Sequence, residues 1–432
     1  MPPPPHELSA SAAARLIRER RLSAEALVAD CLARIGARDA QVRAWAHVDG
    51  DAALAQARAL DRQAPLGPLH GVPVGIKDVI DVAGMPVEFN SPIYRDCRPR
   101  ADAAAVALLR RAGCVILGKT HTAEFAYAHP PPTRNPRNGA HTPGGSSSGS
   151  AAAVADRMVP LALGTQTGGS TIRPAAFCGT IGFKPSFGSI NRAGVKPVAE
   201  SLDTVGLFAN VVDDVALALQ ILSGRAAPDF GAALAAPRIG LARTGRWDDA
   251  EPCMRAALEA AAQRLSAAGA ALRDVELPSQ AEALFDMHED IMTFEAARAL
   301  GWEHAMRREE LSPALLARLE QGRALPREQY DRARLTARDA RRAFSDLMGE
   351  YDLLLMPSAP GEAPEGLAST GNSLFNRVPT LLGVPCINLP FGAGPRGLPL
   401  GVQLVAAFDE DAALLARAQR IAEVLGGQRA RW

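Results

Sequence analysis

The chain has 432 residues, of which 47% are hydrophobic and 22% charged, and this composition excludes an intrinsically disordered or collagen-like chain. Its 47 basic and 47 acidic side chains cancel, so no overall field attracts DNA, RNA or an anionic membrane surface. We therefore expect a soluble globular protein that binds no nucleic acid.

Signals for export and membrane insertion are absent. Met1 to His6 consists largely of prolines, without the basic and apolar regions of a secretory signal, and no stretch approaches the length of a membrane-spanning helix. The six cysteines show no C-x-x-C or metal-type spacing, which fits reduced thiols (Cys31, Cys97, Cys114, Cys178, Cys253 and Cys386). We expect a cytoplasmic protein without disulfides, a bound metal or a membrane anchor.

The first part of the chain alternates helical and strand patterns. The amphipathic pattern of residues 9–35 breaks at 21–23, where Ser23 can cap a second helix. Further helices are predicted over 51–63 and 101–112, and strands over 71–82, ending near Lys77, and over 114–118. Strands that alternate with helices predict a βαβ type of sheet.

The rest of the chain begins with a loop rich in Pro, Asn, Gly and Ser at 130–149, which runs into the alanine-rich helix start SAAAVA. A strand is predicted at 158–163, and the sequence GTQTGGS at 164–170 predicts a turn. Later strands are predicted over 238–242, 353–356, 385–389 and 399–405, and helices over 252–270, 314–348 and 411–425.

Lysine is rare in this chain. Only four of the 47 basic residues are lysines (Lys77, Lys119, Lys184 and Lys196). Arginine fills nearly every cationic role, so a retained lysine marks a candidate site for an amine that loses its proton on burial. For three of the four we favour the simpler interpretation of an apolar stem with a solvated head.

Two Gly/Ser loops follow Lys77. The first, TPGGSSSGSAAAVA at 142–155, has the backbone amides to hold an anion, but it lacks the G-K-[ST] and G-x-G-x-x-G patterns of nucleotide sites. A capped helix after a flexible loop explains it equally well. In the second loop Ser170 follows Gly168 and Gly169, whose N–H groups can face a developing oxyanion, so Ser170 is a candidate nucleophile.

A nucleophilic serine needs a base. No histidine lies in the second loop, although His121, His129 and His141 precede the first one, so a Ser-His-Asp triad stays open. A buried neutral lysine, with a second serine to relay the proton, is the better candidate.

These motifs together resemble the amidase signature family. Ser146 and Ser170 are 24 residues apart in GGSSSGSAAAVADRMVPLALGTQTGGS, which continues TIRPAAFCGTIGFKPSFG, and GVPVGIKD surrounds Lys77 upstream. The resemblance covers most of the chain. It implies an α/β fold with a central mixed β-sheet covered by helices on both faces. It also implies one domain over 1–432, with a helical segment at 1–65, the signature core at 66–215 and the remainder at 216–432.

The resemblance also implies residue roles. Lys77, Ser146 and Ser170 match the family's Ser-Ser-Lys triad, in which the bridging serine is held on a cis peptide. The N–H groups of Thr167, Gly168, Gly169 and Ser170 match the oxyanion hole. The implied chemistry is acyl transfer through a Ser170 acyl-enzyme, with neutral Lys77 as the base and with no metal or organic cofactor.

Three positions depart from the family pattern. Gln166 replaces an aspartate, Ser148 replaces a glycine, and the arginine stands one place later, at Arg173. Without that anionic partner, we hypothesise that Arg173 faces the pocket and pairs with a substrate carboxylate. An ion pair elsewhere in the structure is an equal alternative.

Other substrate-pocket residues are less strongly indicated. Gly144 and Gly145 are candidates through the first loop, and Phe125 and Tyr127 are candidates for the acyl pocket, although aromatic residues there are more often core. Cys178 lacks a nearby base, so we expect a buried apolar role. The pocket is expected to be assembled from loops around 125–134 and 356–380.

The resemblance predicts an amidase that converts a small carboxamide to a carboxylate and ammonia or an amine. One alternative is a glutamine-dependent amidotransferase A-type subunit, which needs partner subunits. Another is a catalytically silent small-molecule binding protein on the same fold. The substituted second loop and a short C-terminal region favour the stand-alone hydrolase, and a homodimer is a family-level expectation.

Overall fold

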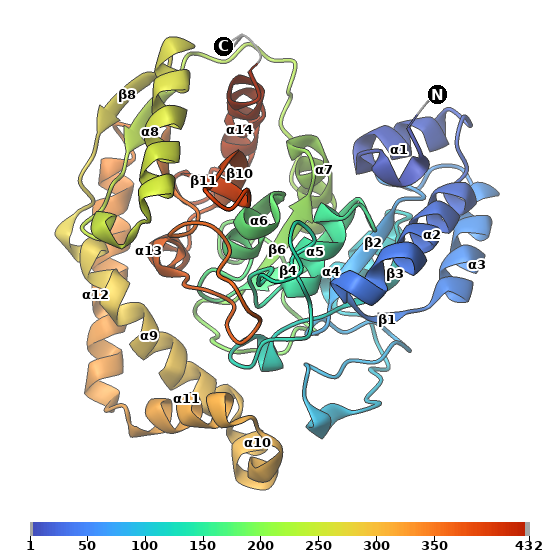
Figure 1. Ribbon diagram of the computed structural model, residues 1–432, viewed down its shortest axis with the longest axis horizontal. Coiled ribbons are helices and arrows are strands. Elements are labelled where there is room, and N and C mark those ends of the chain that lie inside the picture. Colours follow the sequence, from blue (N-terminus) through green and yellow to red (C-terminus); the bar gives the residue numbers. More distant parts are fainter. Residues whose placement is uncertain (1–2, 428–432) are drawn as a thin grey trace.

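The computed structural model describes residues 3–427. Met1 and Pro2, the first residues of the segment that was searched for a targeting signal, lie outside the described residues. Within these residues eleven strands form one sheet in the order β1-β3-β2-β4-β6-β5-β10-β11-β9-β7-β8 (Figure 1). Their bounds are Trp45–Val48 (β1), Pro73–Lys77 (β2), Val115–Thr120 (β3), Leu161–Gln166 (β4), Ile181–Lys184 (β5), Thr204–Ala209 (β6), Arg238–Leu241 (β7), Ala271–Asp274 (β8), Leu353–Pro357 (β9), Cys386–Ala393 (β10) and Pro399–Val405 (β11).

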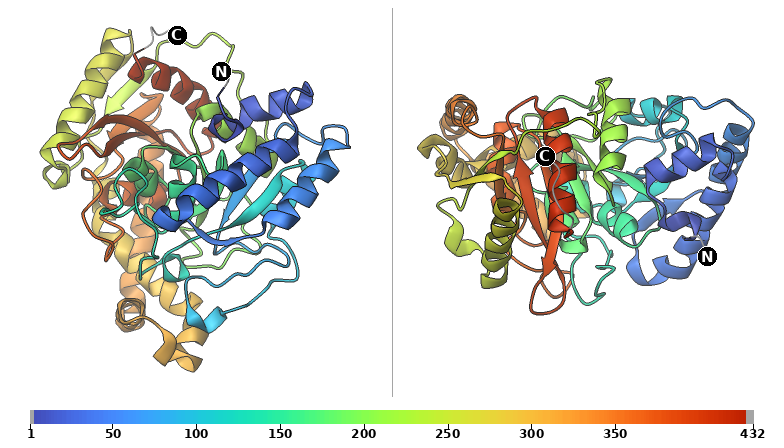
Figure 2. Two further views of the ribbon diagram at one scale, coloured as in Figure 1. Left: turned by 45° about the vertical axis from the view of Figure 1, so that its right-hand side comes forward. Right: turned by 90° about the horizontal axis from the view of Figure 1, so that it is seen from above.

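The sheet is mixed. β2 runs parallel to both β3 and β4, and β7 runs parallel to both β8 and β9, whereas the pairs in between and the β1–β3 pair are antiparallel. The central strands are buried along their whole length, because helices cover both faces of the sheet (Figure 2). The predicted α/β class with a central mixed sheet is confirmed.

The helices form three groups, and their buried faces contribute to three large hydrophobic clusters and one small one, some helices to more than one cluster. One group contributes to the largest cluster: Ala104–Arg111 (α4), Val212–Ser223 (α7), Pro252–Ala267 (α8) and Asp411–Leu425 (α14). A second lies around the N-terminal part: Ala10–Arg18 (α1), Ala24–Val42 (α2), Gly50–Asp61 (α3), Ser148–Ala155 (α5) and Ile172–Cys178 (α6). The third lies at the opposite end of the molecule: Ser279–Ala299 (α9), Gly301–Met306 (α10), Pro313–Ala324 (α11), Arg327–Leu347 (α12) and Leu374–Leu382 (α13) (Figure 1).

Most predicted elements are present, with one clear correction. Ser23 caps α2 by accepting a hydrogen bond from the N–H of Ala26, as predicted. The single helix predicted over 314–348 is wrong, because α11 ends at Ala324 and α12 begins at Arg327, directly after Pro326. Proline at this point removes an N–H donor and stops one helix while starting the next.

The sheet also joins the three segments of the chain that the sequence distinguished. β1 comes from the N-terminal segment, β2 to β6 from the signature core and β7 to β11 from the remainder. Among the described residues, no helix combines the length and apolar character that crossing a membrane requires.

Candidate active site

Lys77 is the last residue of β2 and is completely buried. Its Nζ donates hydrogen bonds to Ser146 Oγ at 2.8 Å and to Thr165 Oγ1, on the adjacent strand β4, at 2.7 Å. Burial lowers the pKa of Lys77 well below its usual value, and Arg173 lowers it further, against an opposing effect of Asp203. The amine of Lys77 therefore lies between two hydroxyl groups, in surroundings that favour its neutral form.

The other lysines differ from this arrangement. Lys119 is fully buried in an ion pair with Asp78 at 2.8 Å, and Lys184 is fully buried with its Nζ donating to the Pro185 carbonyl at 2.8 Å. The expectation of solvated heads is wrong for both of them. Lys196 is partly exposed and pairs with Glu303. Of the four lysines, Lys77 alone has its amine hydrogen-bonded to serine and threonine hydroxyls.

Ser146 lies in the first Gly/Ser loop, two residues before α5. The Gly145–Ser146 peptide bond is cis, as the resemblance implies. Gly144 precedes it with a φ of +80°, and a Cβ there would lie 2.7 Å from Pro174 Cα, so both conformation and space require glycine. Ser148 closes the loop by donating from its Oγ to the Gly144 carbonyl at 2.7 Å.

The second loop, Thr167 to Ser170, connects β4 to α6, and its carbonyl groups are held from outside. The Thr167 carbonyl accepts a hydrogen bond from His288 Nε2 at 2.9 Å, and the Gly168 carbonyl accepts one from Thr380 Oγ1 at 2.7 Å. The Gly169 carbonyl accepts the N–H of Arg173 at 3.0 Å. With the carbonyls turned outward, the N–H groups of the loop are free to face the cavity.

The N–H groups of Gly168, Gly169 and Ser170 have no acceptor within residues 3–427, and all three residues line a cavity. A Cβ on Gly169 would lie 2.3 Å from Asn376 Oδ1, so only glycine fits against α13. Ser170 is almost buried and its Oγ has no hydrogen-bond partner in the described part of the chain. The loop therefore presents one free hydroxyl beside a row of free amide donors.

Gln166 and Asp203 support this loop. Gln166 Oε1 accepts the N–H groups of Thr171 and Ile172, and its Nε2 donates to Thr380 Oγ1 at 3.0 Å. The amide thus joins α6 to α13, which a carboxylate in this place could not do by donation. Asp203 accepts from Thr167 Oγ1 at 2.6 Å, and burial raises the pKa of Asp203 to about 6.

The cavity beside Ser170 has a volume of about 370 Å³ and lies outside the carboxyl ends of the parallel strands β2 and β4. This is where open α/β sheets place ligands. The predicted loops around 125–134 and 356–380 both contribute lining residues, but α9 and α11 also contribute (Ala126, Tyr127, Ala128, Pro130, Thr167, Gly168, Gly169, Ser170, Arg173, Glu289, Met292, Ala314, Arg318, Ala368, Ser369, Thr370, Gly371, Asn372, Ser373 and Arg377).

Arg173 faces this cavity, and the alternative of an ion pair elsewhere is wrong. Its guanidinium donates to the carbonyls of Gly145 and Gly371 and to Thr370 Oγ1, and its buried Nε has no partner. Burial lowers the pKa of Arg173 to about 10, and Arg377 adds to the effect. Neither arginine has an ion-pair partner among the described residues.

The remaining predicted pocket residues lie in different places. Tyr127 lines the cavity. Phe125 does not, because it is fully buried and stacks on Phe89 with ring centroids 5.8 Å apart, so the alternative of a core role holds. Gly144 and Gly145 lie behind the cavity wall, where they shape the loop that carries Ser146.

Several residues at the site were not predicted from the sequence. His288 is buried on α9 with its pKa lowered to about 4 by burial, so it is neutral and donates to the loop rather than to Ser170. Thr165, Asp203, Thr380 and Arg377 were also missed. Thr165 stands in GTQTGGS, but nothing in the sequence marks it as a partner of Lys77, and the other three reach the site from distant parts of the chain.

Comparisons with known proteins agree with this architecture. The family model described as Amidase matches residues 26–415. The chain is 36% identical to the A-type subunit of the glutamyl-tRNA(Gln) amidotransferase of Chloroflexus aggregans, with 95% of each chain covered.

Solved structures of similar fold cover nearly the whole chain. One, reported as a vestigial protein complex that reveals the evolutionary origins of an s-triazine catabolic enzyme, has 30% identity and a TM-score of 0.88, covering 98% of this chain and 100% of that one. Another, described as an amidase, has 31% identity and a TM-score of 0.87, covering 95% and 98%. The chain therefore belongs to the amidase signature family, whose enzymes act on C–N bonds.

Proposed function

We propose that the protein is an amidase that cleaves a small carboxamide through an acyl-enzyme on Ser170, with Ser146 as proton relay and Lys77 as base. The observation that carries this proposal is the buried Lys77 amine, hydrogen-bonded to Ser146 Oγ at 2.8 Å behind the loop that presents Ser170. A neutral amine accepts a proton, which a charged one cannot do, and burial favours the neutral form.

The first half of the proposed reaction forms the acyl-enzyme. Lys77 Nζ takes the proton of Ser146 Oγ, Ser146 takes that of Ser170 Oγ, and Ser170 Oγ bonds to the amide carbon. The carbonyl oxygen becomes an oxyanion that accepts from the free N–H groups of the second loop. When the C–N bond breaks, the nitrogen leaves with the proton returned through Ser146.

The second half releases the acid. A water molecule gives one proton to the same relay and attacks the ester carbon; the bond to Ser170 Oγ breaks as the relay returns that proton to Ser170 Oγ, and the acid departs as a carboxylate after losing its remaining proton to solvent. The test is ammonia release from a panel of aliphatic, aromatic, aminoacyl and carboxylate-bearing amides. We expect turnover of at least one amide, and we expect Ser170→Ala and Lys77→Ala to abolish it while the thermal melt shows a folded protein.

We propose further that the preferred amide carries a carboxylate. Arg173 and Arg377 line the cavity, and each has a buried Nε without a partner. The acidic residue of the lining, Glu289, is paired with Arg318, and so it does not neutralise them. Two guanidinium groups that share a confined cavity without an ion-pair partner raise the free energy of the empty site. A substrate carboxylate that pairs with them is therefore stabilised there.

Arg377 is the better residue for testing this, because Arg173 also holds the Gly145 carbonyl beside Ser146. We expect Arg377→Gln to lower kcat/KM for succinamate by about tenfold to a hundredfold, as for lost hydrogen bonds to a charged group, and to leave butyramide within about twofold. Arg338→Gln, at an exposed arginine of α12 that does not line this cavity, is the matched control and should leave kcat/KM for both amides within about twofold. Equal losses for both amides would contradict the proposal.

A second candidate is an amidotransferase A-type subunit, favoured by the 36% identity to such a protein. Chain length does not separate the two functions, because the alignment covers 95% of that relative. Glutamine also carries a carboxylate, so the arginine pair fits either. Ammonia release by the purified chain alone supports the amidase. Silence toward every amide, with no labelling of Ser170 by a serine-reactive phosphonate, favours a protein that depends on partners or one that only binds its ligand.

A further inference from the structure

A second cavity, of about 450 Å³, lies between α12, the end of α13 and the loops that follow β5 and β11. None of its lining residues also lines the cavity beside Ser170. α13 contributes to both, with Arg377 at the first and Leu382 at the second. The second cavity has no part in the proposed chemistry.

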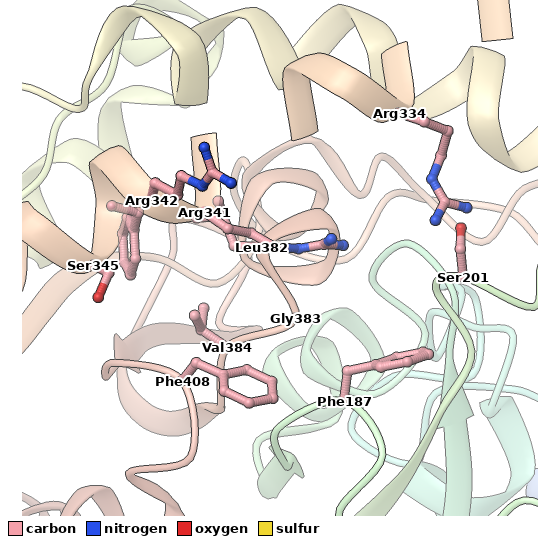
Figure 3. Close-up of a pocket in the computed structure, with 11 residues that line it drawn as sticks. Phe187, Ser201, Arg334, Arg341, Arg342, Ser345, Leu382, Gly383, Val384 and Phe408 are labelled. Atoms are coloured by element: carbon pink, nitrogen blue, oxygen red, sulfur yellow. The ribbon is translucent and has the colours of Figure 1, made fainter. Parts of the chain in front are cut away.

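The walls of this cavity differ in character. Leu382, Val384 and Phe344 form a buried apolar surface, and Phe187 and Phe408 stand opposite α12. Figure 3 shows the rings of these two phenylalanines on one side and the guanidinium groups of the α12 arginines on the other. Phe408 is 55% exposed, which is unusual for a large aromatic side chain and makes its face available to a ligand.

The arginines carry positive charge that the protein only partly compensates. Arg334 is paired with Glu295 at 2.8 Å. Arg341 donates two hydrogen bonds to the Leu381 carbonyl, at 2.8 and 3.2 Å, and Arg342 has neither a hydrogen bond nor an ion pair in the described part of the chain. No lining residue is acidic.

We propose that this cavity is a binding site for a small organic carboxylate with an aromatic body. The anion would lie between Arg341 and Arg342, where guanidinium donors match a carboxylate, and the ring would pack against Phe187 and Phe408. Burial and the nearby Arg334 lower the pKa of Arg341, so its surroundings destabilise the charged guanidinium. A bound carboxylate would stabilise that charge. The volume is within the range of small-molecule sites.

The experiment is calorimetric titration of the full chain with 2-naphthoate, with 2-naphthalenemethanol as the neutral compound of the same body. We expect the carboxylate to bind at least about tenfold more tightly than the alcohol, since hydrogen bonds to charged groups are worth that much. Arg342→Gln should lower the affinity for 2-naphthoate by about tenfold, and Phe408→Ala should lower it as well. Both positions are exposed, so these variants should fold.

Arg338→Gln is the matched control, because Arg338 is an exposed arginine of α12 outside the cavity. It should leave the affinity within about twofold. Equal binding of the alcohol, no binding of 2-naphthoate at millimolar concentration, or unchanged affinity in Arg342→Gln would overturn the proposal. Loss of binding in Arg377→Gln would instead place the ligand beside Ser170. Because no turnover is measured, failure of the amidase proposal leaves this test intact.

Discussion

At the scale of single residues, the burial of Lys77 has a consequence for the pH dependence of activity. The proposed base acts only when neutral, so the rate should rise with pH through the pKa of Lys77 and then level off. Burial lowers that pKa well below 10.5. We therefore expect a plateau well below the pKa of an ordinary lysine in a kcat/KM profile. A rate that rises without levelling until about pH 10 would contradict a neutral resting Lys77.

Substitution of Asp203 tests the role of Lys77 through the direction of a pH shift. Its negative charge raises the pKa of Lys77, against the larger effect of burial. Asp203→Asn removes that charge, so the acidic limb of the kcat/KM profile should move to lower pH. Asp203 also anchors Thr167, so the plateau height should fall as well. The midpoint of the limb is the decisive measurement, and a midpoint that stays fixed or moves upward would contradict the assignment.

At the scale of elements, the second loop depends on α13 for its shape. Thr380 Oγ1 accepts from Gln166 Nε2, and its single proton is shared between the Gly168 carbonyl at 2.7 Å and the Asn376 carbonyl at 2.8 Å. Thr380→Val keeps the volume but leaves the buried Gly168 carbonyl unpaired, which costs about 1–3 kcal/mol. We expect kcat to fall by about tenfold with a smaller change in KM, because the oxyanion donors lose their orientation. Thr380→Ser restores the hydroxyl and should recover most of kcat.

The same elements show what the sequence predicts and what it does not. Short-range signals suffice for β2 ending at Lys77, for the cap at Ser23 and for the helix after the first Gly/Ser loop, because each depends on neighbouring residues. The strands β5 and β6 were not predicted: like β2 they are buried on both faces and lack alternation, but β2 is also marked by β-branched residues between Gly and Pro. The helix α9 was missed altogether, and with it His288.

The candidate site divides in the same way. Composition and the Gly/Ser loops make Lys77 and Ser170 candidates, and the resemblance to the amidase signature family implies them, together with Ser146, as a triad. Their supports could not be predicted, because the partners of the loop lie far along the chain: Thr167 with His288, and Gly168 with Thr380. Folding alone brings these pairs together. Of the two arginines that line the cavity without an ion-pair partner, only Arg173 could be predicted from the sequence, because it stands in a motif and Arg377 does not.

At the scale of the whole molecule, the N-terminal helices are held to the core by a buried carboxylate. Asp214 on α7 accepts the N–H groups of Ala10 and Ser11, each at 2.8 Å, at the start of α1. It is fully buried, and burial raises its pKa from 3.8 to about 6. The carboxylate satisfies two donors of the first helical turn, and its ionisation in this environment carries a free-energy cost.

The sign of that cost gives a prediction. Because the folded state holds the Asp214 proton to higher pH than the unfolded chain, this group makes the free energy of unfolding fall as pH rises from about 4 to about 6, and it adds no further change above that. Asp214→Asn has no such titration. The stability of the natural chain relative to Asp214→Asn should therefore decline by about 3 kcal/mol across this interval, as two pKa units require. Urea unfolding of both proteins at a series of pH values measures it. A difference that grows in favour of the natural chain with rising pH would mean that the two N–H groups outweigh burial and lower the pKa instead.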